Sequence, residues 1–391
     1  MLPEQFGPNA PGRVVRAVQG HWTFLPDSLP PQIQPDWATV QRMSEAERAL
    51  GELAGMGRLI PNPDLLVRPF ISREAVESSR IEGTSTRLDQ LLLHEAQPGD
   101  LRRTRDADEV LNHVRAAEFG LQQVRAGYPI TLTLIKELHR ILLTDVRGED
   151  MRPGEIRDRG VLIGRTGQTY ETARFVPPCH TALGPLLTNF VDFLRAPGGL
   201  PVLAQAAVMH YQFETIHPFS DGNGRVGRLL ITLLLCERGV LPLPLLYLSG
   251  FFDQKREDYY DGLLNVSRRA AWNEWLAYFA YGVTVQARDA AARISRLNDL
   301  RLDYHHRSAA VVRSKAALRL VDELFASPYL TLRRATDVTG ATAKNAQNVI
   351  DKFVAAGLLR EMTGKQRNRV YCADQILHLI DQPMNVPAPT P

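Results

Sequence analysis

One uninterrupted twelve-residue string constrains this chain more than any other feature: residues 217–228 have the sequence HPFSDGNGRVGR. The string places an imidazole, a carboxylate, a Gly-Asn-Gly turn and two guanidinium groups within one loop and one helix start. Residues 200–216, before it, have the composition of a buried or amphipathic helix, and residues 225–238 predict another helix that ends at Gly239. The string therefore predicts a loop between two packed helices that carries reactive groups.

Each group in the string suits a phosphorylated ligand. His217 titrates near neutral pH, so it can accept a proton from an incoming hydroxyl group. Asp221 offers the oxygen ligands that Mg²⁺ prefers, and Mg²⁺ usually completes its shell with phosphate oxygens and water. The glycines let the backbone approach phosphate closely, and a helix N-terminus directs free N–H groups at it. Arg225 and Arg228 are three positions apart, so they share a helix face and can both reach phosphate.

Each feature taken alone has an ordinary structural explanation. A single histidine at a helix end usually has a structural role, an Asp-Gly-Asn-Gly sequence is usually a turn, and paired arginines usually lie in solvent. Their combination within twelve residues is what favours a nucleotide-phosphate site over simple packing.

The string matches the signature of the Fic family, HxFx(D/E)GNGRxxR, at every specified position. The resemblance implies a helical core that transfers AMP from ATP to a Ser, Thr or Tyr hydroxyl of a protein. It implies that His217 is the general base, that Asp221 holds Mg²⁺ and that Phe219 anchors the loop in the core. Asn223 and the adjoining backbone would form an anion hole, and the two arginines would bind the β- and γ-phosphates. The implied nucleotide-binding positions in the string are Gly222, Asn223, Gly224, Arg225, Val226, Gly227 and Arg228.

Two other segments resemble the family. Residues 153–164, which contain a short β-like run at 161–163, resemble the family's β-hairpin flap, which aligns the protein substrate by strand pairing. Tyr259 and Tyr260 resemble the border of the adenine pocket. Because adjacent tyrosines on a helix also serve packing, the sequence leaves their contact with nucleotide open.

An upstream segment resembles an inhibitory element. The sequence SSRIEG, beginning at Ser78, fits the pattern (S/T)xxxE(G/N) of the inhibitory helix in autoinhibited Fic proteins. Ser78 and Glu82 are four positions apart and share a helix face. The resemblance implies that Glu82 pairs with Arg228 and so keeps ATP in an unproductive pose. The alternative is that Glu82 pairs in solvent with Arg80 or Arg87.

The last part of the chain resembles a winged-helix domain. Its predicted elements are a helix, a helix-turn-helix and a two-stranded wing, at residues 311–325, 330–338 with 342–355, and 358–361 with 369–372. Side chains that could contact DNA phosphates and base edges are Lys344, Asn345, Gln347, Asn348, Lys365 and Arg367. Asp351 and Glu361 dilute this patch, and winged helices also serve docking or dimerisation, so both kinds of partner stay open.

Length and composition set the remaining expectations. At 391 residues the chain is long for one core, so we expect two or three domains. The resemblances imply a mainly α fold with three domains. These are an N-terminal Fic-associated domain (1–98), a Fic core (99–307) and a winged helix with a disordered tail (308–391). The net charge of +3 is too small for a chain-wide nucleic-acid binder. The three cysteines show no metal-ligand spacing, and the sequence has neither a signal-peptide pattern nor a long apolar run. These features predict a cytoplasmic location without membrane insertion.

The sequence leaves several functions open. Removal of AMP, with Glu82 positioning a water, uses the same fold and can coexist with transfer. Phosphorylation or phosphocholine transfer is a third reading, and relatives that phosphorylate tend to carry Lys where this chain has Gly224. A DNA-binding regulator that only senses ATP is disfavoured by His217, because a sensor needs no base. Expected partners are a protein substrate at the flap, the chain itself as acceptor, and a second copy in a homodimer.

Overall fold

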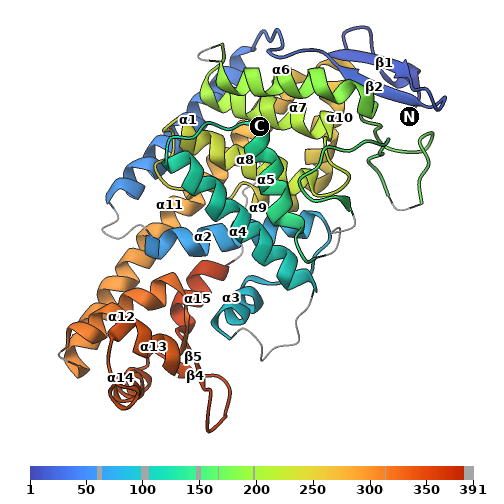
Figure 1. The fold of residues 1–391 in the computed structure, drawn as a ribbon. Helices are drawn as coiled ribbons and strands as arrows, with labels where there is room; N and C mark the ends of the chain where they lie inside the picture. The colour runs from blue at the N-terminus through green and yellow to red at the C-terminus, as the bar shows by residue number, and fades with distance from the viewer. Residues whose placement is uncertain are drawn as a thin grey trace.

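The computed structural model describes residues 1–59, 64–97, 105–146, 151–165, 167–196, 199–312 and 314–382. Most of this part of the chain is α-helical, with two small antiparallel sheets (Figure 1). The prediction of a mainly α fold is therefore confirmed. The predicted disordered tail, residues 383–391, lies outside the described residues. No helix in the described ranges is long and apolar enough to cross a bilayer.

The N-terminal segment forms a hairpin followed by a long helix. After a 3₁₀ turn, η1 (Pro3–Gln5), strands β1 (Gly12–Arg16) and β2 (Trp22–Pro26) pair in antiparallel register. The backbone N–H of Phe24 donates to the carbonyl of Val176 at 2.9 Å, which ties the hairpin to the segment before α6. Helix α1 (Trp37–Leu59) packs along α11 (Trp272–Val311).

Four helices come next along the chain. They are α2 (Asp64–Ile81), α3 (Leu88–Ala96), α4 (Arg105–Arg125) and α5 (Leu132–Leu143). A break at Gly83 separates α2 from α3, and Gly83 adopts a positive φ of 96°. The Thr131 side chain caps α5 by accepting from the N–H of Leu134. In Figure 1, α2 passes between the core above it and the C-terminal module below it.

The core is built around α7 (Val202–Ile216) and α8 (Asn223–Glu237), which pack on each other. Helix α6 (Leu183–Arg195), which follows the turn η3 (His180–Ala182), covers one side. Helix α10 (Arg256–Arg269) packs on α7, and the short α9 (Ser249–Gln254) packs on α2 and α10. Because both central helices are buried almost all round, they fix the loop between them firmly in place.

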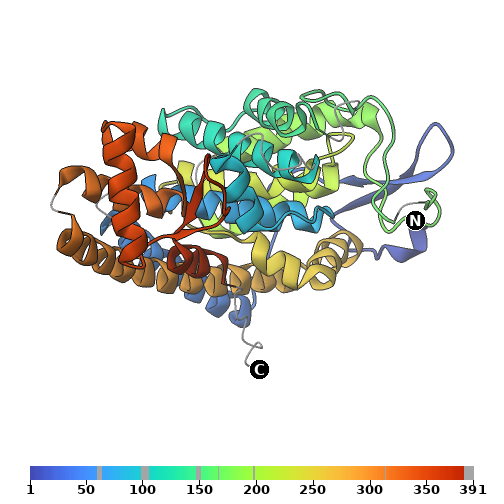
Figure 2. The same ribbon diagram turned by 90° about the horizontal axis from the view of Figure 1, so that it is seen from below.

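Helix α11 (Trp272–Val311) is a 40-residue helix that runs along both the core and the C-terminal module (Figure 2). The sequence predicts that this helix ends at residue 296 and that the polar stretch 303–308 separates two domains. The observed helix continues past residue 296 and through the polar stretch. Tyr304 and Ser308 are buried there, and the Tyr304 hydroxyl donates to the carbonyl of Leu358 at 3.3 Å. The C-terminal module covers this end of the helix, which explains its continuation. The domain limits at 98/99 and 307/308 stay predictions.

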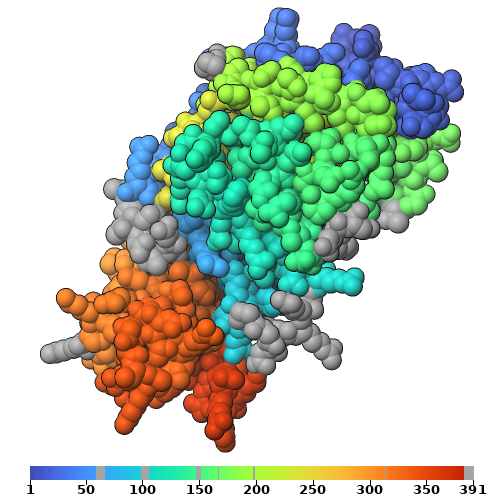
Figure 3. All heavy atoms as spheres, viewed as in Figure 1, coloured from blue at the N-terminus to red at the C-terminus, as the bar shows by residue number. Residues whose placement is uncertain are grey.

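The C-terminal module has the element order of a winged helix and forms a lobe at the lower left of Figure 3. Its sheet has the strand order β3-β5-β4, all antiparallel. The two helices with their turn and both wing strands are observed, but the helix predicted at 330–338 begins only at residue 332, because residues 330 and 331 belong to strand β3, which is too short to show alternation. The sequence analysis predicts neither β3 nor α15. The elements are α12 (Lys315–Ala326), β3 (Tyr329–Thr331), α13 (Leu332–Thr339), α14 (Ala343–Ala355), β4 (Arg360–Glu361), β5 (Val370–Cys372) and α15 (Asp374–Asp381).

Candidate active site

The loop between α7 and α8 turns sharply at both ends. His217 caps α7 in the left-handed conformation, with φ 49° and ψ 63°, and Gly222 precedes α8 with φ 75°. A left-handed backbone is uncommon for a residue other than glycine and usually persists only where neighbours hold it. This local geometry brings the His217 side chain out of the helix and into a cleft.

The cleft has a volume of about 690 Å³, within the size range of small-molecule sites. Its walls come from the flap segment, the loop before α8, α10 and the chain just after α2. The predicted residues that line it are Glu82, His217, Asp221, Gly222, Asn223, Gly224, Arg228, Tyr259 and Tyr260. The structure thus brings together most of the predicted site, from four separate parts of the chain.

His217 is placed to act as a proton acceptor. Burial, together with the charge of Arg157, lowers the pKa of His217 to about 4, so its imidazole is neutral at pH 7. Its Nδ1 lies 3.3 Å from the carbonyl oxygen of Glu214, which can only accept, so Nδ1 carries the proton. Nε2 is then the basic nitrogen, which is the tautomer that a general base at this position needs.

Asn223 fixes the loop instead of presenting its amide to the cleft. Its Oδ1 accepts from the backbone N–H of Phe219, and its Nδ2 donates to the carbonyl of Phe219, both at 2.9 Å. The predicted anion hole would therefore depend on the backbone N–H groups at the start of α8 rather than on this side chain.

His139 on α5 joins the loop to the flap. The N–H of Gly154 donates to His139 Nδ1 at 2.8 Å, so Nε2 carries the proton and donates to the carbonyl of Asp221 at 3.0 Å. The His139 ring also stacks on Phe219 with centroids 3.8 Å apart, which agrees with the predicted anchoring role of Phe219. The side-chain Oδ1 of Asp221 accepts from the N–H of Gly222 at 2.7 Å, and the residue is otherwise exposed at the cleft.

The flap differs in part from the prediction. Residues 162–165 line the cleft, but the run 161–163, expected to be β-like, forms no regular strand. It makes one isolated antiparallel bridge, in which Ile163 and Phe175 exchange both backbone hydrogen bonds, at 2.9 and 3.1 Å. Glycines at 160, 164 and 167 surround the run, and they weaken the extended pairing that a hairpin would need.

Arg225, Val226 and Gly227 do not line the cleft. The Arg225 side chain is 3% exposed, and its Nη1 lies 3.3 Å from Oε2 of Glu109 on α4. Val226 is buried in the core, and a side chain at Gly227 would meet Glu214. The reason is helical geometry: positions 224 and 228 share a face, whereas the three between them turn toward α4 and α7. The structure therefore gives no support to a phosphate contact by Arg225.

Arg228 is enclosed by the segment that the sequence singled out as inhibitory. Its Nη2 lies 2.6 Å from Glu82 Oε1, its Nε donates to Ser78 Oγ at 2.9 Å and Nη2 also donates to the Ser78 carbonyl at 3.0 Å. A Cβ at position 224 would lie 2.2 Å from Glu82 Oε1, so only glycine permits this approach. The alternative partners are engaged elsewhere, Arg80 with Asp253 and Arg87 with Asp89.

Glu82 and Arg228 form an ion pair in which each side chain stabilises the charged form of the other. Burial alone would raise the pKa of Glu82, but the charge of Arg228 and their hydrogen bond hold it below its usual range. The Glu82 side chain is 34% exposed and faces the cleft, whereas that of Arg228 is 2% exposed. At neutral pH, Arg228 therefore faces an ionised carboxylate at the position where a phosphate would approach it.

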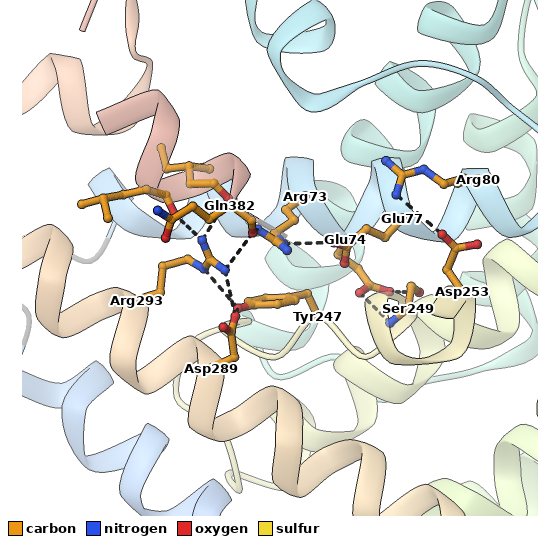
Figure 4. A network of polar contacts seen from close by, with 12 residues as sticks. Arg73, Glu74, Glu77, Arg80, Tyr247, Ser249, Asp253, Asp289, Arg293 and Gln382 are labelled. Atoms are coloured by element: carbon orange, nitrogen blue, oxygen red, sulfur yellow. Dashed lines mark hydrogen bonds and ion pairs between the residues drawn. The ribbon is translucent and has the colours of Figure 1, made fainter. Parts of the chain in front are cut away.

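A network of polar contacts holds α2, the helix that carries Ser78 (Figure 4). Arg73 Nη1 donates to the carbonyls of Ile380 at 2.6 Å and Gln382 at 2.9 Å, at the C-terminal end of α15. Arg293 on α11 donates to the same Gln382 carbonyl at 3.1 Å. Two buried arginines thus meet the carbonyl end of a helix, which carries partial negative charge. They join the C-terminal module to α2 and α11.

Replacing Arg73 with methionine is expected to lower the free energy of unfolding by about 3 kcal/mol, because it leaves buried Glu77, 3.0 Å away, without its cation. Chemical denaturation monitored by circular dichroism measures this. The matched control is Arg80→Met on the same helix, where the side chain is 46% exposed and Asp253 lies 3.6 Å away. That change is expected to cost about 1 kcal/mol or less. Equal losses in the two variants would contradict the role given to Arg73.

Sequence reasoning missed Glu214. This residue on α7 lines the cleft, and burial raises its pKa to about 8, with Arg228 opposing that shift. It lies three positions before His217, and this i,i+3 spacing on a helix is a signal that places both on one face.

Two family models match the chain: the Fic/DOC family N-terminal model over residues 40–122 and the Fic/DOC family model over residues 129–235. The chain therefore carries a Fic/DOC domain preceded by the family's N-terminal region. The second match contains the loop from His217 to Arg228, and the first contains Ser78 and Glu82.

Two named proteins are similar to part of this chain. A probable protein adenylyltransferase of Aquifex aeolicus is 28% identical over 184 residues, which cover 46% of this chain and 53% of that protein. The protein adenylyltransferase Fic of Aedes aegypti is 36% identical over 137 residues, covering 34% and 24%. The chain thus spans about half or less of the length of these relatives. A Fic family protein from Desulfovibrio desulfuricans shares the fold, with a TM-score of 0.57 and 20% identity over 88% of this chain and 98% of that one.

Proposed function

We propose that this Fic protein is a protein adenylyltransferase that transfers AMP from ATP to a Ser, Thr or Tyr hydroxyl of a protein. The observation that carries the proposal is a neutral His217 imidazole in a 690 Å³ cleft, beside the N-terminus of α8. The named adenylyltransferases that resemble residues of this chain support the same chemistry.

The site residues would divide the reaction among them. His217 Nε2 accepts the proton of the hydroxyl group as its oxygen attacks the α-phosphorus of ATP. The bond from the α-phosphorus to the oxygen that bridges to the β-phosphate breaks, and pyrophosphate leaves. Backbone N–H groups at the start of α8 bind phosphate oxygens, and Tyr259 and Tyr260, which line the cleft, would border the base.

Asp221 fits a magnesium ion that is held mainly by the nucleotide. It is a single exposed carboxylate at the cleft, with one oxygen bonded to the Gly222 N–H and the other open. In the described ranges no three metal-ligating side chains cluster. Mg²⁺ commonly takes one or two carboxylates and completes its shell with phosphates and water. When bound, it would neutralise charge on the phosphates.

We further propose that Glu82 restrains this activity. Arg228 is the cation that would otherwise bind the outer phosphate, and Ser78 and Glu82 already occupy its Nε and Nη2. ATP could still enter the cleft, but its terminal phosphate would meet a carboxylate. Transfer is then slow until Glu82 moves away.

Removal of AMP from a modified protein is a second candidate. The observation that favours it is an ionised Glu82 in the same cleft as His217, where a carboxylate can orient a water. Incubation with an AMP-modified protein separates the two, because removal depends on Glu82 and transfer is opposed by it.

The position of the label in ATP tests the proposed chemistry. The Glu82→Gly chain is incubated with Mg²⁺ and either α- or γ-labelled ATP, with lysate proteins as acceptors. Label from the α-position on protein, with none from the γ-position, supports AMP transfer. Label from the γ-position alone would show phosphorylation and overturn the proposal.

For the C-terminal module, charge favours nucleic acid as the proposed partner. Residues 314–382 hold ten Lys and Arg against seven Asp and Glu, which equals the net charge of the whole chain. Lys344, Asn345 and Asn348 are exposed on α14, whereas Gln347 is bonded to Asp351 and Tyr371. We expect the full chain to bind duplex DNA in fluorescence anisotropy, with an affinity that falls steeply as salt rises. No binding at low salt would favour docking or dimerisation instead.

A further inference from the structure

Arg157 is a buried arginine at the start of the flap, and it is 4% exposed. Its guanidinium donates to four backbone carbonyls: His217 at 2.7 Å, Pro178 at 2.7 Å, Arg159 at 3.0 Å and Ile216 at 3.2 Å. Its own backbone N–H donates to the carbonyl of Pro218 at 3.0 Å. Among the described residues no carboxylate pairs with it, and burial lowers its pKa to about 10, so it stays charged at neutral pH.

Arg157 therefore binds three consecutive carbonyls, at positions 216, 217 and 218. They lie where α7 ends, and the last carbonyls of a helix have no partner within it. Burying them without donors is costly, and the Asn223 side chain at the end of the loop does not supply these donors, because it is bonded to Phe219. The planar guanidinium supplies several N–H groups in a fixed arrangement, which lysine cannot reproduce.

This contact is made at the residue whose backbone is least usual. His217 has φ 49° and ψ 63°, and its direction into the cleft depends on that conformation. Donors at the carbonyls on both sides of the His217 α-carbon, and at the next carbonyl, hold the peptide planes that define these angles. The same contacts tie the flap to the loop, so the flap and His217 keep one relative position.

The charge of Arg157 acts on the imidazole as well. Besides burial, the groups that act on His217 are Arg157, which disfavours its protonation, and the Glu214 carbonyl, Glu82 and Asp221, which favour it. Arg157 is the only one of these side chains that opposes protonation, so its removal leaves the Glu214 carbonyl and Asp221 unopposed even in a chain that lacks Glu82. The pKa of His217 would then rise toward its ordinary value.

We propose that Arg157 is a positioning residue for His217, which fixes the backbone of residues 216–218 and directs the imidazole into the cleft. The inference rests on the proposed role of His217 as the base. It assigns to the flap a second task, besides lining the cleft: the flap carries the cation that orients the base.

The test compares Arg157→Met and Arg157→Lys with Arg159→Met, each in the Glu82→Gly chain. Arg159 is the matched control, because it is exposed and lies two positions away in the same flap. The pKa of His217 is measured by NMR titration of labelled histidine, and its signal is assigned by its loss in His217→Ala. We expect Arg157→Met to raise the pKa of His217 by roughly one unit, and Arg157→Lys and Arg159→Met to leave it nearly unchanged.

The kinetic readout separates positioning from general stability. In both Arg157 variants we expect kcat for AMP incorporation to fall about tenfold to a hundredfold with little change in the KM for ATP. In Arg157→Met, the loss of kcat on acidification should also begin at a higher pH, because the pKa of His217 is higher. An unchanged kcat in Arg157→Lys, or an unshifted His217 in a folded Arg157→Met, would overturn the inference. If Arg157→Met does not fold, the kcat of Arg157→Lys decides.

The proposed function and the role of Arg157 can be disproved separately. If the Glu82→Gly parent transfers no AMP, the proposed function fails, and the NMR titration still measures whether Arg157 acts on His217. If the parent is active and the Arg157 variants behave like Arg159→Met, the proposed function stands and the role of Arg157 is wrong.

Discussion

Replacing Glu82 with glycine is expected to raise AMP incorporation about tenfold to a hundredfold, a typical range for relief of one coupled contact. The change removes the carboxylate that lies 2.6 Å from Arg228 Nη2, and it leaves the guanidinium free to bind the outer phosphate of ATP. Because Glu82 follows the last residue of α2 and is 34% exposed, the substitution should not disturb the core. Initial rates with ATP and Mg²⁺ measure the effect.

The variant Ser78→Ala tests how much of the restraint on AMP incorporation comes from the Ser78 hydroxyl. Ser78→Ala removes only the hydroxyl that accepts from Arg228 Nε at 2.9 Å, while the Ser78 carbonyl and Glu82 still bind Nη2. We expect a smaller increase than in Glu82→Gly. The exposed acid Glu45, paired with Arg42 on α1 at 3.6 Å, provides a control change to glutamine that should not alter the rate. A Glu82→Gly rate equal to that of the unmodified chain would rule out this restraint.

Replacing His217 with alanine in the Glu82→Gly chain is expected to lower AMP incorporation by about 10²- to 10⁴-fold, the usual contribution of a general base. ATP affinity, measured by calorimetry, should change little, because the phosphate-binding N–H groups and Arg228 remain. The control is His306→Ala, which removes an exposed histidine on α11. If the double variant kept most of its activity, a group other than His217 would have to accept the proton.

The parts of this site that sequence could predict are those fixed by local geometry. The string from His217 to Arg228 defines a helix end, a turn and a helix start, and each of them is present. Ser78 and Glu82 are one helical turn apart, and this spacing is why both can reach the same guanidinium. The pairing with Arg228 itself came from resemblance, because 146 residues separate the partners.

The parts that sequence could not predict depend on packing between distant elements. Arg225 has the residue type of a phosphate ligand, but Glu109 on α4 approaches it from 116 positions away and draws it into the core. Arg157 shows no periodic signal, and its role follows only from the end of α7 lying beside it. Likewise, the polar stretch at 303–308 predicts a boundary, yet the C-terminal module covers it and α11 continues.

The most direct test of the central claim is mass spectrometry of three chains after incubation with ATP and Mg²⁺ in the presence of lysate proteins: the unmodified chain, Glu82→Gly, and Glu82→Gly with His217→Ala. The account predicts an added AMP on the Glu82→Gly chain or on proteins incubated with it, and little or none with the other two chains. AMP added equally by the single and double variants, or none added to any protein by Glu82→Gly, would contradict it.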